Sequence, residues 1–219
     1  MKKPSFNSVS QMPRKSKGWN VKIERPEEIC QSPNEYYTKE EVEKYAKSSH
    51  MRIIQRKLTS RILEMMGAKP PAKVLDIGCG VGYSTELLKE LGFDVVGFDV
   101  NKDMIKIARS KGLKVVEGDM IEVDKHFEKD SFDFVVSTSS LQWIKDMNDI
   151  KKIVKGINHV LKLNGGLGIQ FYPKSEEELD KIFQKFRRNG FDGDIFIDNP
   201  DSPKTRTIYL IMKKRQSIS

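Results

Sequence analysis

A glycine-rich segment at residues 74–82 has the residue types and spacing best suited to binding a small molecule. It reads Val-Leu-Asp-Ile-Gly-Cys-Gly-Val-Gly, a short apolar run that ends in a G-x-G-x-G loop. Glycine lets a ligand approach the backbone closely, and the N–H groups at the start of a following helix are free to bind it. Nicotinamide and flavin binders use the related pattern G-x-G-x-x-G. Here Asp76 lies two residues before the first glycine, where a carboxylate suits a ligand with a cationic amino group better than a pyrophosphate.

Two more acidic residues follow the next two apolar runs. Asp99 ends the run at residues 95–99, a position from which a carboxylate accepts hydrogen bonds from ribose hydroxyls. Asp119 follows the third run, where it can accept the exocyclic N–H of adenine while Met120 packs on the ring. Taken singly, Asp99 could flank a helix N-cap and Asp119 could occupy a turn. Together with the glycine loop and in this order, they predict S-adenosylmethionine as the cofactor.

Candidate nucleophiles, bases and metal ligands are few. Cys79 lies inside the glycine loop and Cys30 lies well before the first predicted strand, so neither suits the nucleophile that carbon-5 methylation of pyrimidines requires. Exocyclic amino methylation would call for an Asn/Asp-Pro-Pro-aromatic block, but residues 139–142 read Ser-Ser-Leu-Gln. Guanine N7 has a lone pair and no proton, so alignment alone can promote its methylation. We therefore expect no general base and no metal, and we interpret the three histidines, His50, His126 and His159, as surface or packing residues.

A parallel sheet wrapped by helices is predicted to position these residues. Apolar runs alternate with amphipathic segments from residue 73 onward. A capping box at Thr38 and Glu41, and an apolar face over residues 49–66, predict two helices before the first strand. Two late runs joined by a turn-rich loop predict an antiparallel pair at the sheet end. The predicted strands are residues 74–77, 95–98, 114–117, 132–136, 167–171, 194–197 and 207–212, and the later helices are 83–91, 103–111, 149–161 and 175–188.

Composition and charge limit which classes of protein this chain can belong to. The 219 residues are 37% hydrophobic and 32% charged, and no apolar run is long enough to cross a bilayer. Two cysteines indicate a reducing compartment, and no secretory signal is evident. Residues 1–25 carry seven bases and one acid, and residues 204–219 carry five bases and no acid, although the charge between them is balanced. Such basic ends are typical of proteins that bind a polyanion, and they can also serve solubility alone.

Beyond these motifs, the chain resembles class I S-adenosylmethionine-dependent methyltransferases from residue 73 to about residue 171. Over residues 25–213 it is more closely similar to the eukaryotic and archaeal enzymes that methylate guanine N7 in small-subunit ribosomal RNA. This closer resemblance rests on Arg25-Pro-Glu-Glu28, on Tyr45, Ser49, Gln55, Arg61 and Leu63-Glu64, on Ser139-Ser-Leu-Gln-Trp143, on Gln170-Phe-Tyr-Pro173, and on residues 198–204 with Tyr209-Leu210.

The resemblance implies an α/β fold of the Rossmann-like methyltransferase type. Its seven-stranded, mostly parallel sheet would have helices on both faces and an antiparallel C-terminal hairpin. Residues 1–25 would form a basic tail, 26–213 the methyltransferase domain and 214–219 a short basic tail. Within the domain, helices at 26–72 would form a lid over the sheet core at 73–213.

The resemblance also implies which residues contact the cofactor and the substrate. The expected cofactor residues are Asp76, Gly78, Cys79, Gly80, Gly82, Asp99, Val100, Asp119, Met120 and Ser137. The expected substrate residues are Tyr45, Gln55, Gln142, Trp143 and Tyr172. Trp143 and Tyr172 follow strands and could stack on a splayed base, although Trp143 could instead be a packing residue at the rim.

The activity implied is formation of 7-methylguanosine in small-subunit ribosomal RNA during ribosome biogenesis, with the pre-ribosomal particle as partner. A small-molecule methyltransferase and an assembly factor that acts mainly by binding remain alternatives. The strand at 114–117 is expected at the sheet edge, where a small zinc-ribbon activator would add a strand, unless flanking charge already protects it. We expect no membrane partner and a cytoplasmic location for an archaeal-type or compact member, or a nuclear or nucleolar one for a eukaryotic member.

Overall fold

The computed structural model describes residues 25–215, so most of the predicted N-terminal tail and residues 216–219 lie outside the described part. Its strands are β1 (Lys73–Ile77), β2 (Asp94–Asp99), β3 (Val115–Glu117), β4 (Phe132–Thr138), β5 (Leu161–Phe171), β6 (Phe191–Asp198) and β7 (Thr207–Lys214). Its α-helices are α1 (Pro26–Ile29), α2 (Pro33–Tyr36), α3 (Lys39–Lys47), α4 (Ser49–Met66), α5 (Tyr83–Glu90), α6 (Lys102–Ser110), α7 (Val123–His126), α8 (Met147–Val160) and α9 (Glu176–Arg188). Two 3-10 turns are η2 (Met120–Glu122) and η3 (Leu141–Trp143).

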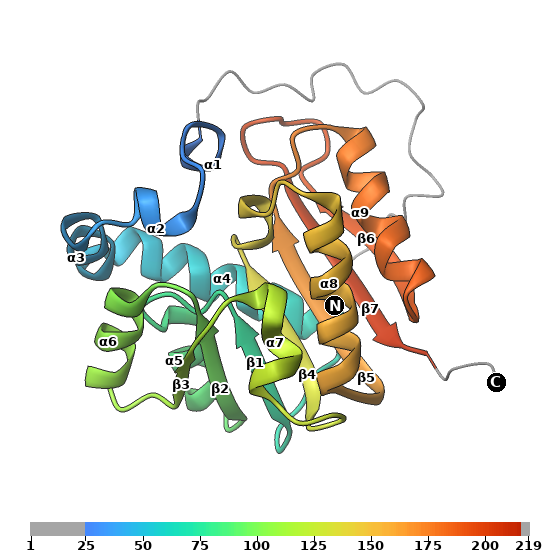
Figure 1. Cartoon of the computed structure of the whole chain (residues 1–219), viewed down its shortest axis with the longest axis horizontal. Helices are drawn as coiled ribbons and strands as arrows, with labels where there is room; N and C mark the ends of the chain where they lie inside the picture. Colours follow the sequence, from blue (N-terminus) through green and yellow to red (C-terminus); the bar gives the residue numbers. More distant parts are fainter. Residues whose placement is uncertain (1–24, 216–219) are drawn as a thin grey trace, which may run out of the picture.

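The seven strands form one sheet in the order β3-β2-β1-β4-β5-β7-β6 (Figure 1). Strands β1 to β5 pair in parallel, and β7 runs antiparallel to both β5 and β6. The predicted fold class, with its antiparallel C-terminal hairpin, is confirmed. The strand order reverses between β1 and β4, which is where ligands bind in open sheets of this kind.

Helices cover both faces of the sheet because side chains alternate along each strand. Leu75 of β1 packs in a cluster with α8 and α9, and these helices lie in front of the sheet in Figure 1. Val74, one residue earlier, packs in a second cluster with Leu58 and Ile62 of α4, which passes behind the sheet. A third cluster joins Val42 of α3 to the start of α5 and to α6, and it holds the N-terminal helices in place.

The N-terminal helices begin and end at residues with clear capping chemistry. Thr38 accepts a hydrogen bond from the Glu41 N–H, as the predicted capping box requires, but the Glu41 carboxylate accepts from Lys44 at 2.6 Å instead of closing the box. Helix α4 has the predicted bounds, and Gly67 ends it in the left-handed conformation at φ 63°. The short helices α1 and α2 were not predicted, although each begins with proline, which is a helix-start signal.

Several strands extend further than their apolar runs, and β5 and β7 show why. Strand β5 begins at Leu161 and not at residue 167, so it includes the exposed residues Lys162, Leu163 and Asn164. Strand β7 continues through Lys214, one residue beyond the predicted domain end, because its ammonium contacts Asp130 and the Leu161 carbonyl. These strand ends take part in backbone pairing and side-chain contacts that hydrophobic periodicity does not reveal.

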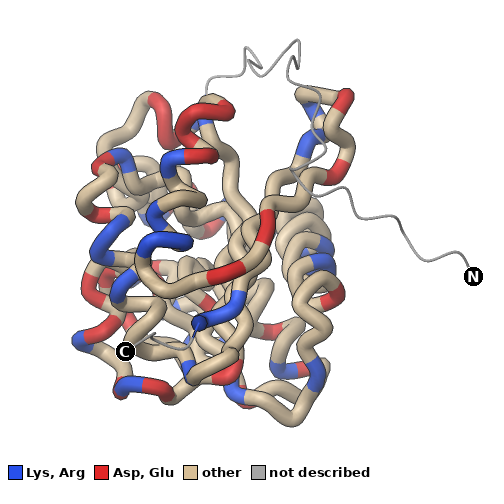
Figure 2. The backbone as a smooth tube through the Cα atoms, turned by 90° about the vertical axis from the view of Figure 1, so that its right-hand side faces the viewer, with Lys and Arg blue, Asp and Glu red and all other residues tan. Residues whose placement is uncertain are grey.

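Charge on the described part of the chain is mixed. On the side formed by the later helices and strands, Lys and Arg are interspersed with Asp and Glu (Figure 2). No helix within residues 25–215 is long and apolar enough to cross a membrane.

Candidate functional site

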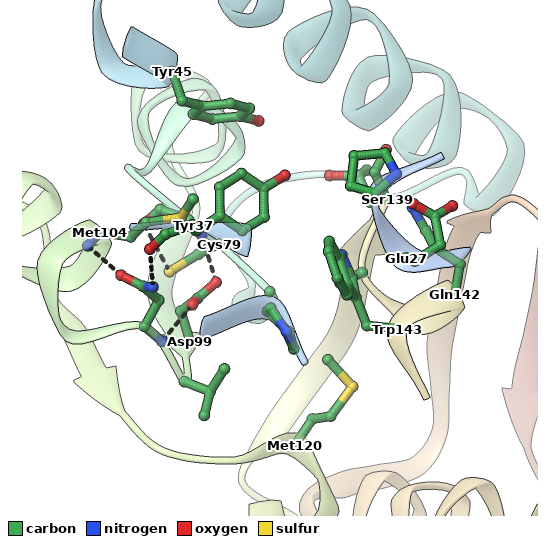
Figure 3. A pocket seen from close by; sticks show the side chains of 18 of the residues that line it. Glu27, Tyr37, Tyr45, Cys79, Asp99, Met104, Met120, Ser139, Gln142 and Trp143 are labelled. Carbon is green, nitrogen blue, oxygen red and sulfur yellow. Dashed lines mark hydrogen bonds between the residues drawn. The ribbon is translucent and has the colours of Figure 1, made fainter. Parts of the chain in front are cut away.

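A cavity of about 510 Å³ lies where β1, β2 and β4 end, beneath the helices α1 to α4 (Figure 3). This volume falls within the range of small-molecule sites. Its walls come from the glycine loop, from the turns after β2, β3, β4 and β5, and from the N-terminal helices. The cavity therefore lies at the carboxyl ends of the parallel strands, and the N-terminal helices cover it.

Two of the three glycines in the loop line the cavity, and the third allows close packing elsewhere. Gly78 and Gly80 line the cavity, and Gly78 has φ 75°. A Cβ atom at Gly78 would lie 2.4 Å from Cβ of Ser140, so glycine allows the loops after β1 and β4 to pack together. Gly82 does not line the cavity. It precedes α5 with φ 91°, and a Cβ there would lie 2.3 Å from Leu113.

Asp99 fixes the glycine loop and faces the cavity beside Val100. Its two carboxylate oxygens accept hydrogen bonds from the N–H groups of Gly80 and Asn101, both at 2.8 Å. Burial raises the pKa of Asp99, and these backbone donors oppose the increase. The Asn101 side chain donates in turn to Asn34 and to the Tyr37 carbonyl, so the turn after β2 is joined to the N-terminal helices.

Asp119 and Met120 line the cavity after β3, as predicted. One Asp119 oxygen accepts from the Ile121 N–H at 2.9 Å, which holds the side chain in a turn conformation. The turn role and the cavity position are therefore compatible. Met120, Val100 and Phe98 give this part of the wall an apolar surface suited to a flat ring.

Asp76 and Ser137 do not line the cavity, so their predicted contacts with the cofactor stay predictions. Asp76 is 1% exposed, and one of its oxygens accepts from Ser84 at 2.5 Å and from Thr85 at 2.6 Å. Its other oxygen has no partner. Burial raises the pKa of Asp76 to about 6. Strand alternation turns this side chain toward α5, so it reaches the cavity only through Ser84, which does line it.

Ser137 is engaged with its own loop. Its hydroxyl shares a hydrogen bond of 2.5 Å with the Ser140 hydroxyl, and it does not line the cavity. Ser139, which the sequence placed only in a motif, does line it and has φ 54°. Such a conformation is rare for a residue with a side chain and is often found at functional sites.

A hydrogen-bond network holds Ser139 and brings Gln55 to the cavity. The Thr138 hydroxyl donates to the Gln55 side-chain oxygen at 2.8 Å, and the Gln55 amide donates to the Ser139 hydroxyl at 3.4 Å. The Ser139 N–H and hydroxyl both donate to Gln170 of β5, at 3.1 and 2.9 Å. The network joins α4, β4 and β5 and places Gln55 in the cavity wall, and its contact with substrate stays a prediction.

Aromatic side chains form the upper wall. Tyr37 lies 5.9 Å from both Tyr45 and Trp143, measured between ring centroids. Burial and then the neighbouring Tyr36 raise the pKa of Tyr37 to about 12, and burial also raises the pKa of Tyr45. These tyrosines are therefore neutral near pH 7. Tyr37 and Tyr45 line the cavity, which supports the lid interpretation.

The remaining predicted substrate residues, Gln142, Trp143 and Tyr172, also line the cavity. Trp143 is only 7% exposed and its ring lies against Tyr36 and Tyr37, so it is a packing residue that also lines the cavity. The Arg25 guanidinium lies 4.9 Å from the Tyr172 ring centroid and donates to the Tyr172 carbonyl. Sequence reasoning did not single out Arg25, Glu27, Asn34 or Asn101 as cavity residues, and the only available signal was the Arg25-Pro-Glu-Glu28 motif.

The cavity offers no evident nucleophile. Burial raises the pKa of the Cys79 thiol well above its ordinary value, and none of the three histidines lines the wall. Within residues 25–215, no group of three or more His, Cys, Asp or Glu side chains could hold a metal ion. The arrangement is suited to binding and aligning reactants.

The lining residues fit S-adenosylmethionine. Three carboxylates, Glu27, Asp99 and Asp119, line the cavity with one cation, Arg25, so the site favours a positively charged ligand. The glycine loop leaves room for close contact with the backbone, and the carboxylates after β2 and β3 are spaced along the wall beside apolar side chains.

Comparisons with known proteins agree with this interpretation. A model of the methyltransferase domain matches residues 75–169. The 18S rRNA (guanine(1575)-N(7))-methyltransferase of Saccharomyces cerevisiae is 35% identical over 193 residues, which are 82% of this chain and 69% of that protein. The 18S rRNA (guanine-N(7))-methyltransferase of Schizosaccharomyces pombe is 30% identical over 203 residues, 87% of this chain and 75% of that protein. A solved S-adenosylmethionine-dependent methyltransferase from Archaeoglobus fulgidus is 23% identical with a TM-score of 0.61, covering 78% of this chain and 97% of that one.

Proposed function

Because the chain belongs to the 18S rRNA (guanine-N7)-methyltransferase family, we propose that it methylates N7 of a guanine in small-subunit ribosomal RNA during ribosome biogenesis. S-adenosylmethionine supplies the electrophilic methyl group when it is bound. The observation that carries the proposal is the single cavity that joins Asp99 and Asp119 on one side to Trp143 and Tyr172 on the other. One side suits a nucleoside cofactor and the other an aromatic base.

The residues of this chain act by holding the two reactants in line. In this proposal Gly80 and Asp99 bind the ribose, and Asp119 with Met120 binds the adenine. Their common position in the cavity wall supports these roles. The half-buried Tyr37 and Tyr45 cover the cavity and would limit the access of water to the two reactants. No side chain has to remove a proton because guanine N7 carries none, so positioning accounts for the acceleration.

Transfer of label from the cofactor tests this function. Purified small subunits and a metabolite extract would each be incubated with the enzyme and methyl-labelled S-adenosylmethionine. We expect label in the subunits, in a single 7-methylguanosine that disappears from the RNA when the gene is deleted. Label found only in the extract would overturn the proposal and favour a small-molecule substrate.

A binding-only role in assembly is tested in cells. An Asp99→Ala variant should lose cofactor binding because it removes the two backbone contacts that shape the loop. If cells with this variant assemble small subunits normally while cells without the gene do not, binding matters more than methylation.

We propose a cytoplasmic location on the basis of the rRNA substrate and the two free cysteines, Cys30 and Cys79.

We also propose that a small zinc-ribbon activator adds a strand beside β3. Within residues 25–215 this three-residue strand pairs only with β2 and forms one edge of the sheet. The Lys114 carbonyl accepts from Gly97 and the Gly118 N–H donates to Asp99, so both residues face β2. Successive residues of a strand point their backbone N–H and carbonyl groups to opposite sides, so those of Val115 and Glu117 point away from β2. They are available to a partner strand.

The outward N–H of Glu117 allows a sharp test. Glu117→Pro removes it, whereas Glu117→Ala removes the same exposed side chain and keeps the N–H. We expect co-purification with the activator to fail for the proline variant and to persist for the alanine variant, with equal thermal stability as the control. A wild-type monomer that is fully active and ignores the activator at micromolar concentration would overturn the proposal.

A further inference from the structure

A buried carboxylate lines the cavity without a partner. Glu27 of α1 is 6% exposed, and no hydrogen bond or ion pair joins its carboxylate to another residue within 25–215. The neighbouring cation, Arg25, is already engaged with the Tyr172 ring and carbonyl. A ligand that fills the cavity displaces water from this carboxylate, and displacing that water without supplying a donor is costly. The position therefore indicates a ligand that donates hydrogen bonds to Glu27.

A second acceptor lies beside it. The side-chain oxygen of Gln142 is buried and has no hydrogen-bond partner. Glu27 and Gln142 both line the cavity and also share a small adjoining recess, and Figure 3 shows them on the same side of the site. Helix α1 is held there by the Arg25 contact and by Lys145, which donates to the Cys30 carbonyl at 2.8 Å. The fold thus keeps two unsatisfied acceptors together.

We propose that Glu27, assisted by Gln142, recognises the N1–H and the N2 amino group of the acceptor guanine. This inference rests on the proposed function and identifies the residues that choose the base. An ionised carboxylate accepts only, and guanine presents adjacent donors at N1 and N2. Adenine presents a lone pair at N1, which a carboxylate repels. Enzymes that act on splayed bases commonly read this edge and stack the ring between side chains.

The placement of these residues also orients the reacting atom. Guanine N7 lies across the ring system from N1 and N2. In Figure 3, Glu27 and Gln142 lie on the right, Asp99 and Cys79 on the left, and Trp143 between them. A guanine held by its N1 and N2 edge therefore directs N7 toward the cofactor side of the cavity. Trp143 lies between the two sides and can stack on the ring, and Tyr172 lines the same cavity.

The test compares Glu27→Gln with Glu43→Gln, which removes the same charge from an exposed residue of α3 that lines neither the cavity nor the recess. The acceptors are small subunits and a short RNA copied from around the methylated guanine, made with guanine or with inosine, which lacks the N2 amino group. We expect Glu27→Gln to lower kcat/KM for guanine roughly 10- to 100-fold, as for removal of a hydrogen bond to a charged group. The loss should be smaller for inosine, and Gln142→Met should show a weaker form of the same pattern.

Binding and stability measurements separate recognition from a structural role. Calorimetric affinity for S-adenosylhomocysteine should be unchanged in Glu27→Gln, and Tm should stay equal or rise, because an unpaired buried charge is removed. Glu43→Gln should match the wild type throughout. Equal losses on guanine and inosine, or activity equal to wild type, would overturn this inference while leaving the proposed function intact. Failure of the wild-type enzyme to methylate either RNA would overturn both.

Discussion

Replacing Asp76 with Asn should remove a pH dependence from the stability of the protein. Burial raises the pKa of Asp76 from 3.8 to about 6, against the lowering effect of hydrogen bonds from Ser84 and Thr85. An acid whose pKa is higher in the folded state binds its proton more tightly when folded. Stability therefore falls as pH rises between the unfolded and folded pKa values. This is the opposite of the usual behaviour of a paired surface carboxylate.

The size of the effect follows from the two pKa values. At about 1.4 kcal/mol per unit, the increase from 3.8 to about 6 corresponds to about 3 kcal/mol. Below about pH 4 both states hold the proton, and Asp76 contributes no difference. Above about pH 6 both states are ionised, and the folded state carries the full cost of the buried charge. The Asn variant has no titrating group at this position.

Urea unfolding of both proteins at a series of pH values measures this cost. The unfolding free energy of the Asp76→Asn variant minus that of wild type should rise by about 3 kcal/mol across the window and then become constant. A constant offset reflects how the amide is accommodated, so only the change with pH is diagnostic. In Ser84→Ala, the loss of a donor that lowers the folded pKa should extend the upper end of the window to higher pH, while the lower end stays at the unfolded pKa. A difference that is independent of pH, or that falls as pH rises, would refute the reasoning.

Three other changes test different parts of the molecule. Gly78→Ala places a Cβ 2.4 Å from the Cβ of Ser140, at a residue with φ 75°. Calorimetry should therefore show weaker binding of S-adenosylhomocysteine, and chemical unfolding should show that the protein loses at least about 1 kcal/mol of stability. Affinity equal to wild type would contradict this prediction. Arg61→Gln breaks two 3.1 Å hydrogen bonds to Asp198, which should cost about 1 kcal/mol of unfolding free energy and leave cofactor affinity unchanged. Deleting residues 1–24, which lie outside the described part, should weaken RNA binding and reduce the logarithmic salt slope by roughly 0.7 to 0.9 for each phosphate that this segment neutralises. An unchanged slope would assign that segment to solubility alone.

Local signals predicted the regular elements well. Helix α4 spans the predicted residues because Ser48 caps its start and Gly67 ends it, and both signals are local in the sequence. The helices α1, α2 and α7 are four residues long, which is too short for a hydrophobic period to be recognised. The exposed start of β5 was missed because its residues are set by pairing with β4 and not by their own hydrophobicity.

The sequence by itself determined that carboxylates after successive strands meet at one site, because parallel strands end at the same edge of a sheet. Asp99 and Asp119 could be placed for that reason. Only the tertiary structure decided that Asp76 turns toward α5 and that Glu27 lies beside Gln142. The first depends on which face of the sheet a strand residue occupies. The second depends on packing between segments far apart in the chain, which no local pattern encodes.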